Sequence, residues 1–453
     1  MIPAAFEPFL EEAPLCVMTR LTLESLFDPN RLDALFRDTA QRQYEQELLF
    51  SQVVELMTSV VLRVHPSVLA AYKKRKSQLT VSDQAVYDKL QCMEVGVSEA
   101  LVADSAIQVA PLLKALGGLL PPWLSGYRTR VLDGNHLSKT ERRLKVLRHT
   151  WAAALPGKVL AVYEQELDLV TRVFLTPDGH AQERSLLDDI LASVQARDLW
   201  MADRNFCTLK FLFGIAAAQA VFVIRQHGQL QGCLLGQRRA RGRTATGKVY
   251  EQALQLEYEG QTWTVRRITL LLEQPTQDGD TEIHILTNLP AKAASAAQVA
   301  DLYRKRWTIE GRFYEVTQTL NCEPNTLGYP KAALFAFCLA LVASNAVALL
   351  KAALRSVHED KVVAQMSSYY VGLEIQETYR GMMIALPPAQ WERFRGLTAA
   401  ALAQVLRQVA RRVQPQEYAK SKRGPKKPPP PKGKYHNGGH VSTHKLLENQ
   451  RLQ

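Results

Sequence analysis

Two acidic residues stand directly after short apolar runs, where a buried strand would end. Asp133 follows 128–132 and is itself followed by Gly134, and Asp203 follows 199–202 and precedes Arg204. In open α/β folds, a carboxylate at the C-terminal end of a strand points into the crevice where ligands bind. The small and polar residues after each acid are typical of a loop edge open to substrate. Both acids are therefore candidates for chemistry.

A third candidate acid, Glu310, lies in a predicted helix that runs from residue 296 to residue 320. Tyr303, Arg306 and Glu310 are spaced i, i+3 and i+7, which places an aromatic ring, a cation and an acid on one helix face. Trp307 is turned about 100° away from Arg306, so we expect it to pack in the core. A face of this composition suits phosphate and metal binding better than a core.

Three carboxylates without a paired Cys or His are hard-oxygen ligands, the set preferred by Mg²⁺ or Mn²⁺. Two such ions can activate a nucleophile and stabilise the leaving oxygen in a phosphoryl displacement. Arg306 would then neutralise a phosphate, and Tyr303 would donate to it or stack on a base. The alternative is structural: Asp133 and Asp203 as turn residues, and Glu310 in a salt bridge with Arg306.

The elements that must position these acids alternate between strands and helices. Strand-like runs at 128–132, 158–163, 168–175, 199–202 and 221–225, with helical segments at 181–195 and 206–218, predict a mixed α/β sheet of the ribonuclease H-like kind. A β-rich insertion follows at about 228–290, with candidate strands at 250–258, 263–272 and 282–286. It includes an exposed basic loop that carries Arg238, Arg239, Arg241 and Arg243.

The flanking sequence predicts further domains. Residues 1–125 are read as a helical DNA-binding domain, 126–350 as the catalytic domain, 351–415 as a helical region and 416–453 as a basic, proline-rich tail. The uncharged stretch 332–350 fits a buried core helix better than a membrane span, because it is Ala-rich and contains Ser344 and Asn345. We therefore expect no membrane association.

Charge and cysteine content narrow the setting. The net charge is 56 − 44 = +12, and residues 407–453 hold twelve basic and two acidic side chains, so 12 − 2 = +10 of it lies at the C-terminus. This predicts an extended, disordered tail that grips DNA without sequence preference. The six cysteines show no metal-binding spacing, which favours a reducing cytoplasm.

Three sequence blocks carry a resemblance to a known family. The chain resembles the DDE transposases of bacterial insertion sequences, specifically the insertion-sequence-four family, in Asp133-Gly134-Asn135-His136-Leu137, Ala202-Asp203-Arg204-Asn205-Phe206 and Tyr303-x-x-Arg306-Trp307-x-Ile309-Glu310-x-x-Phe313. The gaps of 203 − 133 = 70 and 310 − 203 = 107 residues fit that family, whose long second gap holds a β-rich insertion.

The resemblance implies a function and its partners. It implies that Asp133, Asp203 and Glu310 bind two Mg²⁺ or Mn²⁺ ions. The reaction would be metal-dependent nicking of double-stranded DNA at the element's ends, followed by strand transfer into target DNA. A homodimer in the DNA complex, in a nucleoid-associated bacterial protein, belongs to the same expectation.

One position departs from the family signature, which continues to a Lys seven residues after the Glu. Here 310 + 7 is Thr317, and the phosphate contact would have to come from Lys331, Arg312 or the basic loop at 238–243. Two alternatives therefore stay open: a catalytically inactive or repurposed DNA-binding derivative of a transposase, and a related ribonuclease H-like nuclease.

Overall fold

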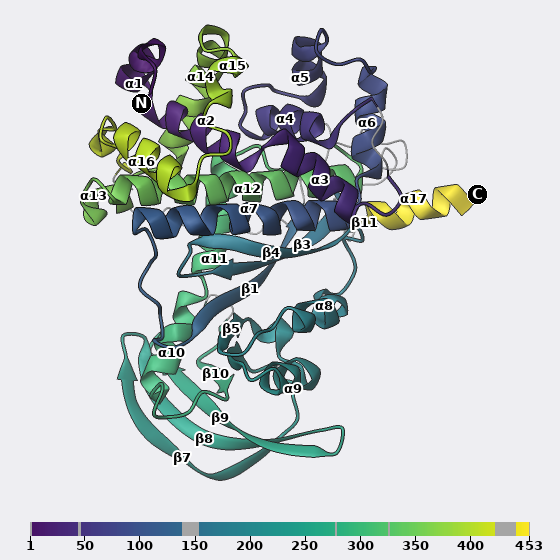
Figure 1. The fold of residues 1–453 in the computed structure, drawn as a ribbon. Coiled ribbons are helices and arrows are strands. Elements are labelled where there is room, and N and C mark those ends of the chain that lie inside the picture. Colours follow the sequence, from purple (N-terminus) through teal and green to yellow (C-terminus); the bar gives the residue numbers. More distant parts are fainter. Residues whose placement is uncertain are drawn as a thin grey trace.

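The computed structural model describes residues 2–43, 47–137, 154–276, 279–324, 327–421 and 441–452. Within these ranges, one nine-stranded sheet with the order β4-β3-β1-β5-β6-β10-β9-β8-β7 runs through the molecule. Helices from both ends of the chain lie together on one side of it, and a curved β-arm extends from the other end of the sheet (Figure 1).

Five strands form the central part of the sheet: β1 (Arg128–Leu137), β3 (Gly157–Glu164), β4 (Leu169–Thr176), β5 (Asp198–Ala202) and β6 (Val221–Arg225). β3 is antiparallel to both β1 and β4, whereas β1, β5 and β6 are parallel to one another. With β1, β3, β4, β5 and β6 taken in chain order, the spatial order is 3-2-1-4-5. The predicted mixed α/β fold of the ribonuclease H-like kind is confirmed.

The β-rich insertion is a continuation of this sheet. β10 (Glu282–Thr287) pairs with β6, and β9 (Gln261–Leu272), β8 (Gly247–Tyr258) and β7 (Cys233–Thr244) follow outward as antiparallel neighbours. The prediction of a basic loop at 238–243 is wrong, because these residues belong to the edge strand β7. Its arginine-rich sequence lacks apolar alternation because the strand is exposed along almost its whole length.

Each face of the central sheet is covered by its own helices, because successive strand residues point to opposite sides. Val131 belongs to the core shared with the long helices α7 (Val95–Leu116) and α12 (Pro330–Arg355). Leu132 belongs instead to a second core with α8 (Leu187–Ala192) and α9 (Leu209–Ala217). A residue's position along a strand therefore decides which helical layer it meets.

Helices from the two ends of the chain contribute to one core around α7 and α12 (Figure 1). From the N-terminal part these are α1 (Glu7–Glu12), α2 (Pro14–Leu26), α3 (Pro29–Thr39), α4 (Phe50–Val61), α5 (Val68–Arg75) and α6 (Asp83–Cys92). From the C-terminal part they are α13 (Asp360–Ala364), α14 (Ser368–Ala385), α15 (Pro388–Glu392) and α16 (Ala399–Ala410). The boundaries expected at residues 125, 350 and 415 stay predictions.

The end of the chain is ordered where the structure describes it. Residues 441–442 form β11 (Val441–Ser442), which pairs in parallel with β2 (Ala154–Leu155), and α17 (Thr443–Leu452) follows. Lys445 also forms an ion pair of 3.2 Å with Asp178. The prediction of a disordered tail is therefore wrong for residues 441–452, and residues 422–440 lie outside the described ranges.

Two helices, α7 and α12, are long and apolar enough to cross a membrane by length and composition. Of the most apolar window of α12, 89% is buried inside the protein. The prediction of a core helix at 332–350 is confirmed, since nearly every residue there is buried.

Asn345, the amide in this apolar helix, completes the hydrogen bonding of the edge strand β4. Its Oδ1 accepts the N–H of Val170 at 3.0 Å, and its Nδ2 donates to the carbonyl of Val170 at 2.9 Å. The same Nδ2 donates to Ser105 Oγ on α7 at 3.0 Å. Because Asn345 is only 1% exposed, it satisfies backbone groups that water does not reach.

We expect Asn345→Leu to destabilise the protein by about 1–3 kcal/mol, because it leaves the two buried backbone groups of Val170 unpaired. Thermal unfolding should show a lower midpoint, and hydrogen exchange should be faster at the Val170 amide. Ser105→Ala is the matched control, since it removes one hydrogen bond of Asn345 and leaves Val170 paired. Unchanged exchange at Val170 in Asn345→Leu would contradict this account.

Candidate active site

The first two acids lie side by side because of the register of the central strands. β1 and β5 are parallel, and the pairing from Arg128↔Asp198 to Val131↔Met201 keeps a constant offset of 201 − 131 = 70 residues. Asp133 and Asp203 differ by the same 70 residues, so they occupy equivalent positions two residues beyond the last pair. Neighbouring strands are about 4.8 Å apart. The sequence spacing of 70 is thus the strand offset itself.

Arg306 brings the third acid to this place. Its Nη1 lies 3.1 Å from Asp133 Oδ2, and its Nη2 lies 2.8 Å from Glu310 Oε1. The side chains of Arg306 and Asp133 are 8% and 14% exposed, whereas Glu310 is 49% exposed. One buried guanidinium therefore neutralises two of the three candidate acids, and the salt bridge between Arg306 and Glu310 that the structural alternative required is present.

The helix that carries this group is broken, in contrast to the continuous helix predicted over 296–320. α10 (Ala296–Lys305) ends before Arg306, and α11 (Thr308–Thr319) begins two residues later, with Glu310 in its first turn. Tyr303 on α10 is only 7% exposed, and its ring centre lies 6.0 Å from the Arg306 guanidinium carbon. The break lets Arg306 reach Asp133 and Glu310 together.

Trp307 lies at the same break, and the prediction that it packs in the core is wrong. Its side chain is 51% exposed. The prediction assumed a regular helix, in which a residue next to Arg306 turns toward the opposite side. Because α10 ends at Lys305, that periodicity does not hold at residue 307.

The electrostatics of the site concentrate on Asp133. Burial raises the pKa of this carboxyl to about 6, and the nearby charges of Asp203 and Glu310 raise it further while Arg306 and the N–H of Gly134 lower it. Asp133 thus carries its negative charge at neutral pH only against a cost from burial and from its acidic neighbours. An additional cation near Asp133 would reduce that cost.

The oxygen-rich composition suits a hard divalent cation, although the side chains are not arranged as a finished metal site. Among the described residues, no three His, Cys, Asp or Glu side chains are grouped closely enough to hold a metal ion. Arg306 supplies the positive charge to Asp133 and Glu310 instead. The carboxylates fit Mg²⁺ or Mn²⁺ by donor type, and binding would require Arg306 to move away from one or both.

Sequence reasoning did not identify the residues that hold the Asp203 turn. Asp203 Oδ1 accepts the N–H of Asn205 at 2.8 Å, and the side chain of Asn205 donates to the carboxylate of Glu183. Glu183 lies in a segment predicted as helix, and it has no spacing relation to Asp203 that would mark it. Only the packing of that segment against the end of β5 brings the two together.

The arginines of β7 are largely engaged with acids of the same β-arm. Arg238 pairs with Glu282 at 3.2 Å and lies over the ring of Tyr250. The remaining pairs are Arg241 with Glu251 at 3.2 Å and Arg243 with Glu273, and Arg239 is exposed. Exposed pairs of this kind contribute about 0–1 kcal/mol each, so a DNA phosphate can compete for these cations.

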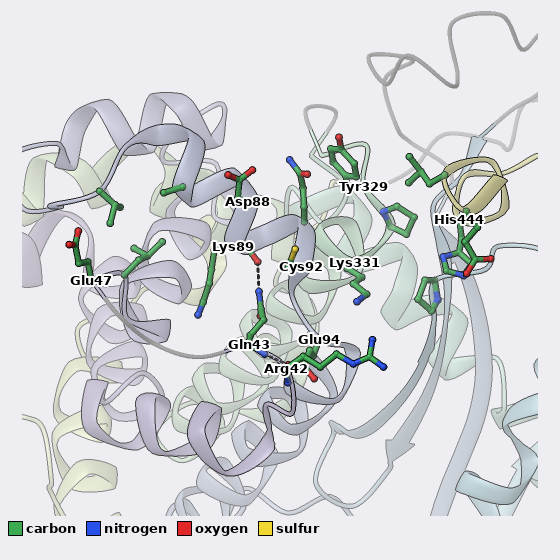
Figure 2. A pocket seen from close by; sticks show the side chains of 18 residues that line it. Arg42, Gln43, Glu47, Asp88, Lys89, Cys92, Glu94, Tyr329, Lys331 and His444 are labelled. Carbon is green, nitrogen blue, oxygen red and sulfur yellow. Dashed lines mark hydrogen bonds and ion pairs between the residues drawn. The ribbon is translucent and has the colours of Figure 1, made fainter. Parts of the chain in front are cut away.

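A groove of about 1130 Å³ lies apart from the acids, between α6, the start of α12 and α17 (Figure 2). Its charged lining is mixed, with Arg42, Lys89 and Lys331 opposed by Asp88 and Glu94 among others. This balance does not select a phosphate backbone. Lys331, considered above as a substitute for the lysine missing at Thr317, lines this groove, and none of the three acids does. The side chain of Arg312 lies outside the described residues.

The raised pKa of Asp133 predicts a pH-dependent effect of Asp133→Asn in metal-free protein. Because the folded state holds this proton more tightly, the stability contributed by Asp133 falls as the pH rises from 3.8 to about 6. The variant removes that cost, so it should be more stable than the parent at pH 7.5, by up to about 3 kcal/mol. At pH 5 the gain should be about half as large.

Urea unfolding at the two pH values, with EDTA present, measures this difference. Asp188→Asn is the control, since Asp188 is 73% exposed and pairs with Lys210 on the surface. A less stable Asp133→Asn at pH 7.5 would show that the Arg306 ion pair outweighs the cost of burial.

Comparison with known proteins places the acids within a described domain. Residues 125–346 match the family model of the transposase DDE domain. No curated protein matches the chain. A solved piggyBac transposase synaptic complex with hairpin DNA is similar at 9% identity and a TM-score of 0.41, over 83% of this chain and 82% of that one. This likeness is too distant to support an argument. The segment that carries Asp133, Asp203 and Glu310 is thus similar to a transposase DDE domain.

Proposed function

We propose that this chain is a metal-dependent DDE transposase that cuts DNA at the ends of an insertion sequence and joins them to target DNA. The observation that carries the proposal is the convergence of Asp133, Asp203 and Glu310 in the segment matched by the DDE domain. Strand register brings the first two acids together, and Arg306 brings the third. The signature of Tyr303, Arg306 and Glu310 supports assignment to the insertion-sequence-four family.

In this proposal, Asp133, Asp203 and Glu310 hold two Mg²⁺ or Mn²⁺ ions. Bound there, the ions supply Lewis acidity that activates the attacking oxygen and stabilises the leaving one. Arg306, released from its carboxylates, contacts a DNA phosphate through its guanidinium fork. Tyr303 lies beneath Arg306 and supports it from α10.

The chemistry has two displacements at phosphorus. In the first, a water oxygen attacks the scissile phosphate, and the bond to the 3′-oxygen breaks to leave a 3′-hydroxyl. In the second, this hydroxyl attacks a phosphate of the target, forming the new bond and releasing a target 3′-hydroxyl. Each step exchanges one phosphate ester or water oxygen for another, so no oxidant or other co-reactant is needed.

The DNA contacts proposed outside the centre are electrostatic. β7 presents Arg238, Arg239, Arg241 and Arg243 at the edge of the β-arm, where they can exchange their acidic partners for phosphates. A homodimer would place two such centres on the two transposon ends. DNA as the substrate would place the protein in the cytoplasm, associated with the nucleoid.

A second candidate is a derivative that binds DNA without cutting it. Thr317 stands where the family signature has a lysine, and Arg306 blocks Asp133 and Glu310 with an ion pair. An inactive protein would keep this arrangement permanently. An active one would have to open it in the presence of metal and DNA.

We expect Asp133→Asn, Asp203→Asn and Glu310→Gln each to lower the rate of end cleavage by at least about 1000-fold, because each removes an anionic metal ligand while keeping size and hydrogen bonding. The assay follows cleavage and strand transfer of DNA that carries the element's own terminal repeats, with Mg²⁺ or Mn²⁺. Binding of the same DNA should be nearly unchanged.

Asp188→Asn is the matched control, since it removes an exposed acid of the same domain and should retain full activity. Cleavage that survives Asp203→Asn would overturn the assignment. Binding without cleavage by the parent chain, under conditions in which metal binds, would favour the inactive derivative. Cleavage of DNA without terminal repeats, and without strand transfer, would favour a nuclease.

The basic C-terminal segment generates a separate prediction for binding. Replacing Lys426, Lys427, Lys432 and Lys434 with Gln should weaken binding to DNA of any sequence. The slope of log K against log salt should become shallower by up to about 0.9 for each phosphate that a lysine no longer neutralises. Fluorescence anisotropy across a salt series measures both. An unchanged slope would show that these lysines do not bind phosphate.

A further inference from the structure

Glu183 and Arg184 hold the turn that carries Asp203. They lie in a short 3-10 helix, Glu183–Leu186, on the α8 side of the sheet. The side-chain amide of Asn205 donates to the carboxylate of Glu183, and Arg184 Nε donates to the carbonyl of Asn205 at 2.7 Å. The N–H of Asn205 in turn donates to Asp203 Oδ1 at 2.8 Å. Asn205 is therefore fixed at both its side chain and its carbonyl while its N–H orients Asp203.

Glu183 also packs against the strand that carries Asp133. A Cβ atom added to Gly134 would lie 2.2 Å from Glu183 Oε1 and 3.0 Å from Leu160 Cδ2. The absence of a side chain at Gly134 is thus what lets the Glu183 carboxylate approach β1. One carboxylate contacts both segments that supply the central acids.

The alternation of β1 places Glu183 beneath the acids. Leu132 and Leu160 belong to the core on the α8 side, so Gly134, two residues after Leu132, faces the same way. Asp133 faces the opposite side, where Arg306 binds it. Glu183 reaches the site from the sheet face opposite to Arg306, which suits a supporting role better than direct binding of a metal held from the other side.

We propose that Glu183 is a positioning residue that fixes Asp203 for metal binding through Asn205. The inference rests on the proposed function, in which Asp203 is a metal ligand. Hydrogen-bond partners of metal ligands hold them in the binding orientation, and their loss typically weakens metal affinity by about 10- to 100-fold.

The test is Mn²⁺ binding to the full chain without DNA, followed by electron paramagnetic resonance of free Mn²⁺. Glu183→Ala should weaken Mn²⁺ affinity by about 10- to 100-fold, because Asn205 loses its acceptor. Glu183→Gln should bind Mn²⁺ nearly as well as the parent, since its amide oxygen still accepts from Asn205. Rescue by the uncharged variant separates positioning by a hydrogen bond from a contribution of charge.

A double-mutant cycle gives a second, independent readout. Asn205→Ala keeps the backbone N–H to Asp203 and loses the side chain that Glu183 holds, so it should weaken Mn²⁺ affinity as Glu183→Ala does. The two effects should not add in the double variant, because they interrupt one series of hydrogen bonds. Asp188→Asn should bind Mn²⁺ like the parent.

The outcomes separate this inference from the proposed function. If Asp203→Asn leaves Mn²⁺ affinity unchanged, the proposed function fails. If Asp203→Asn weakens binding but Glu183→Ala only lowers the thermal midpoint, the inference alone is overturned and Glu183 is structural. Equal losses in Glu183→Gln and Glu183→Ala would also overturn it, in favour of a direct or electrostatic role. Additive losses in the double variant would show that Asn205 and Glu183 act separately.

Discussion

The site depends on how negative charge is balanced at the end of two parallel strands. Asp133 and Asp203 are brought together by hydrogen-bonded register, which no side-chain adjustment can relax. Their repulsion, together with the burial of Asp133, must be offset by a cation. In the metal-free protein Arg306 provides it, and the break between α10 and α11 is what allows this arginine to reach the strand. The helix, the strand ends and the acids thus form one electrostatic unit.

Much of this arrangement can be predicted from sequence because the signals are local. Short apolar runs ended by an acid predicted the strands of Asp133 and Asp203, and the uncharged stretch 332–350 predicted the buried helix α12. The sequence separation of the two acids already contained their register, which became visible only when the strand pairing was known. Periodicity and strand ends are properties of neighbouring residues, so they can be recognised without tertiary structure.

Features set by contacts distant in sequence could not be predicted in this way. The arginine-rich run at 238–243 has no apolar alternation, yet it forms strand β7 because β8 offers it a hydrogen-bonding edge. Residues 441–452 are ordered by pairing with β2 and by Asp178. Trp307 is exposed because the helix breaks beside it, and Glu183 approaches Gly134 only through packing of the α8 side. Each depends on a partner segment that composition does not reveal.

The β-arm leaves the central sheet and returns to it at the same place. Gln226, just after β6, donates its backbone N–H to the carbonyl of His284 in β10 at 2.8 Å, so the two ends of the 57-residue excursion (284 − 227 = 57 residue steps) are joined by hydrogen bonds. Changes in length between these ends do not alter where the chain re-enters the sheet or where α10 begins. In evolutionary terms, the arm can be lengthened, shortened or exchanged as a module, and DNA contacts can diversify there while the acids stay in register.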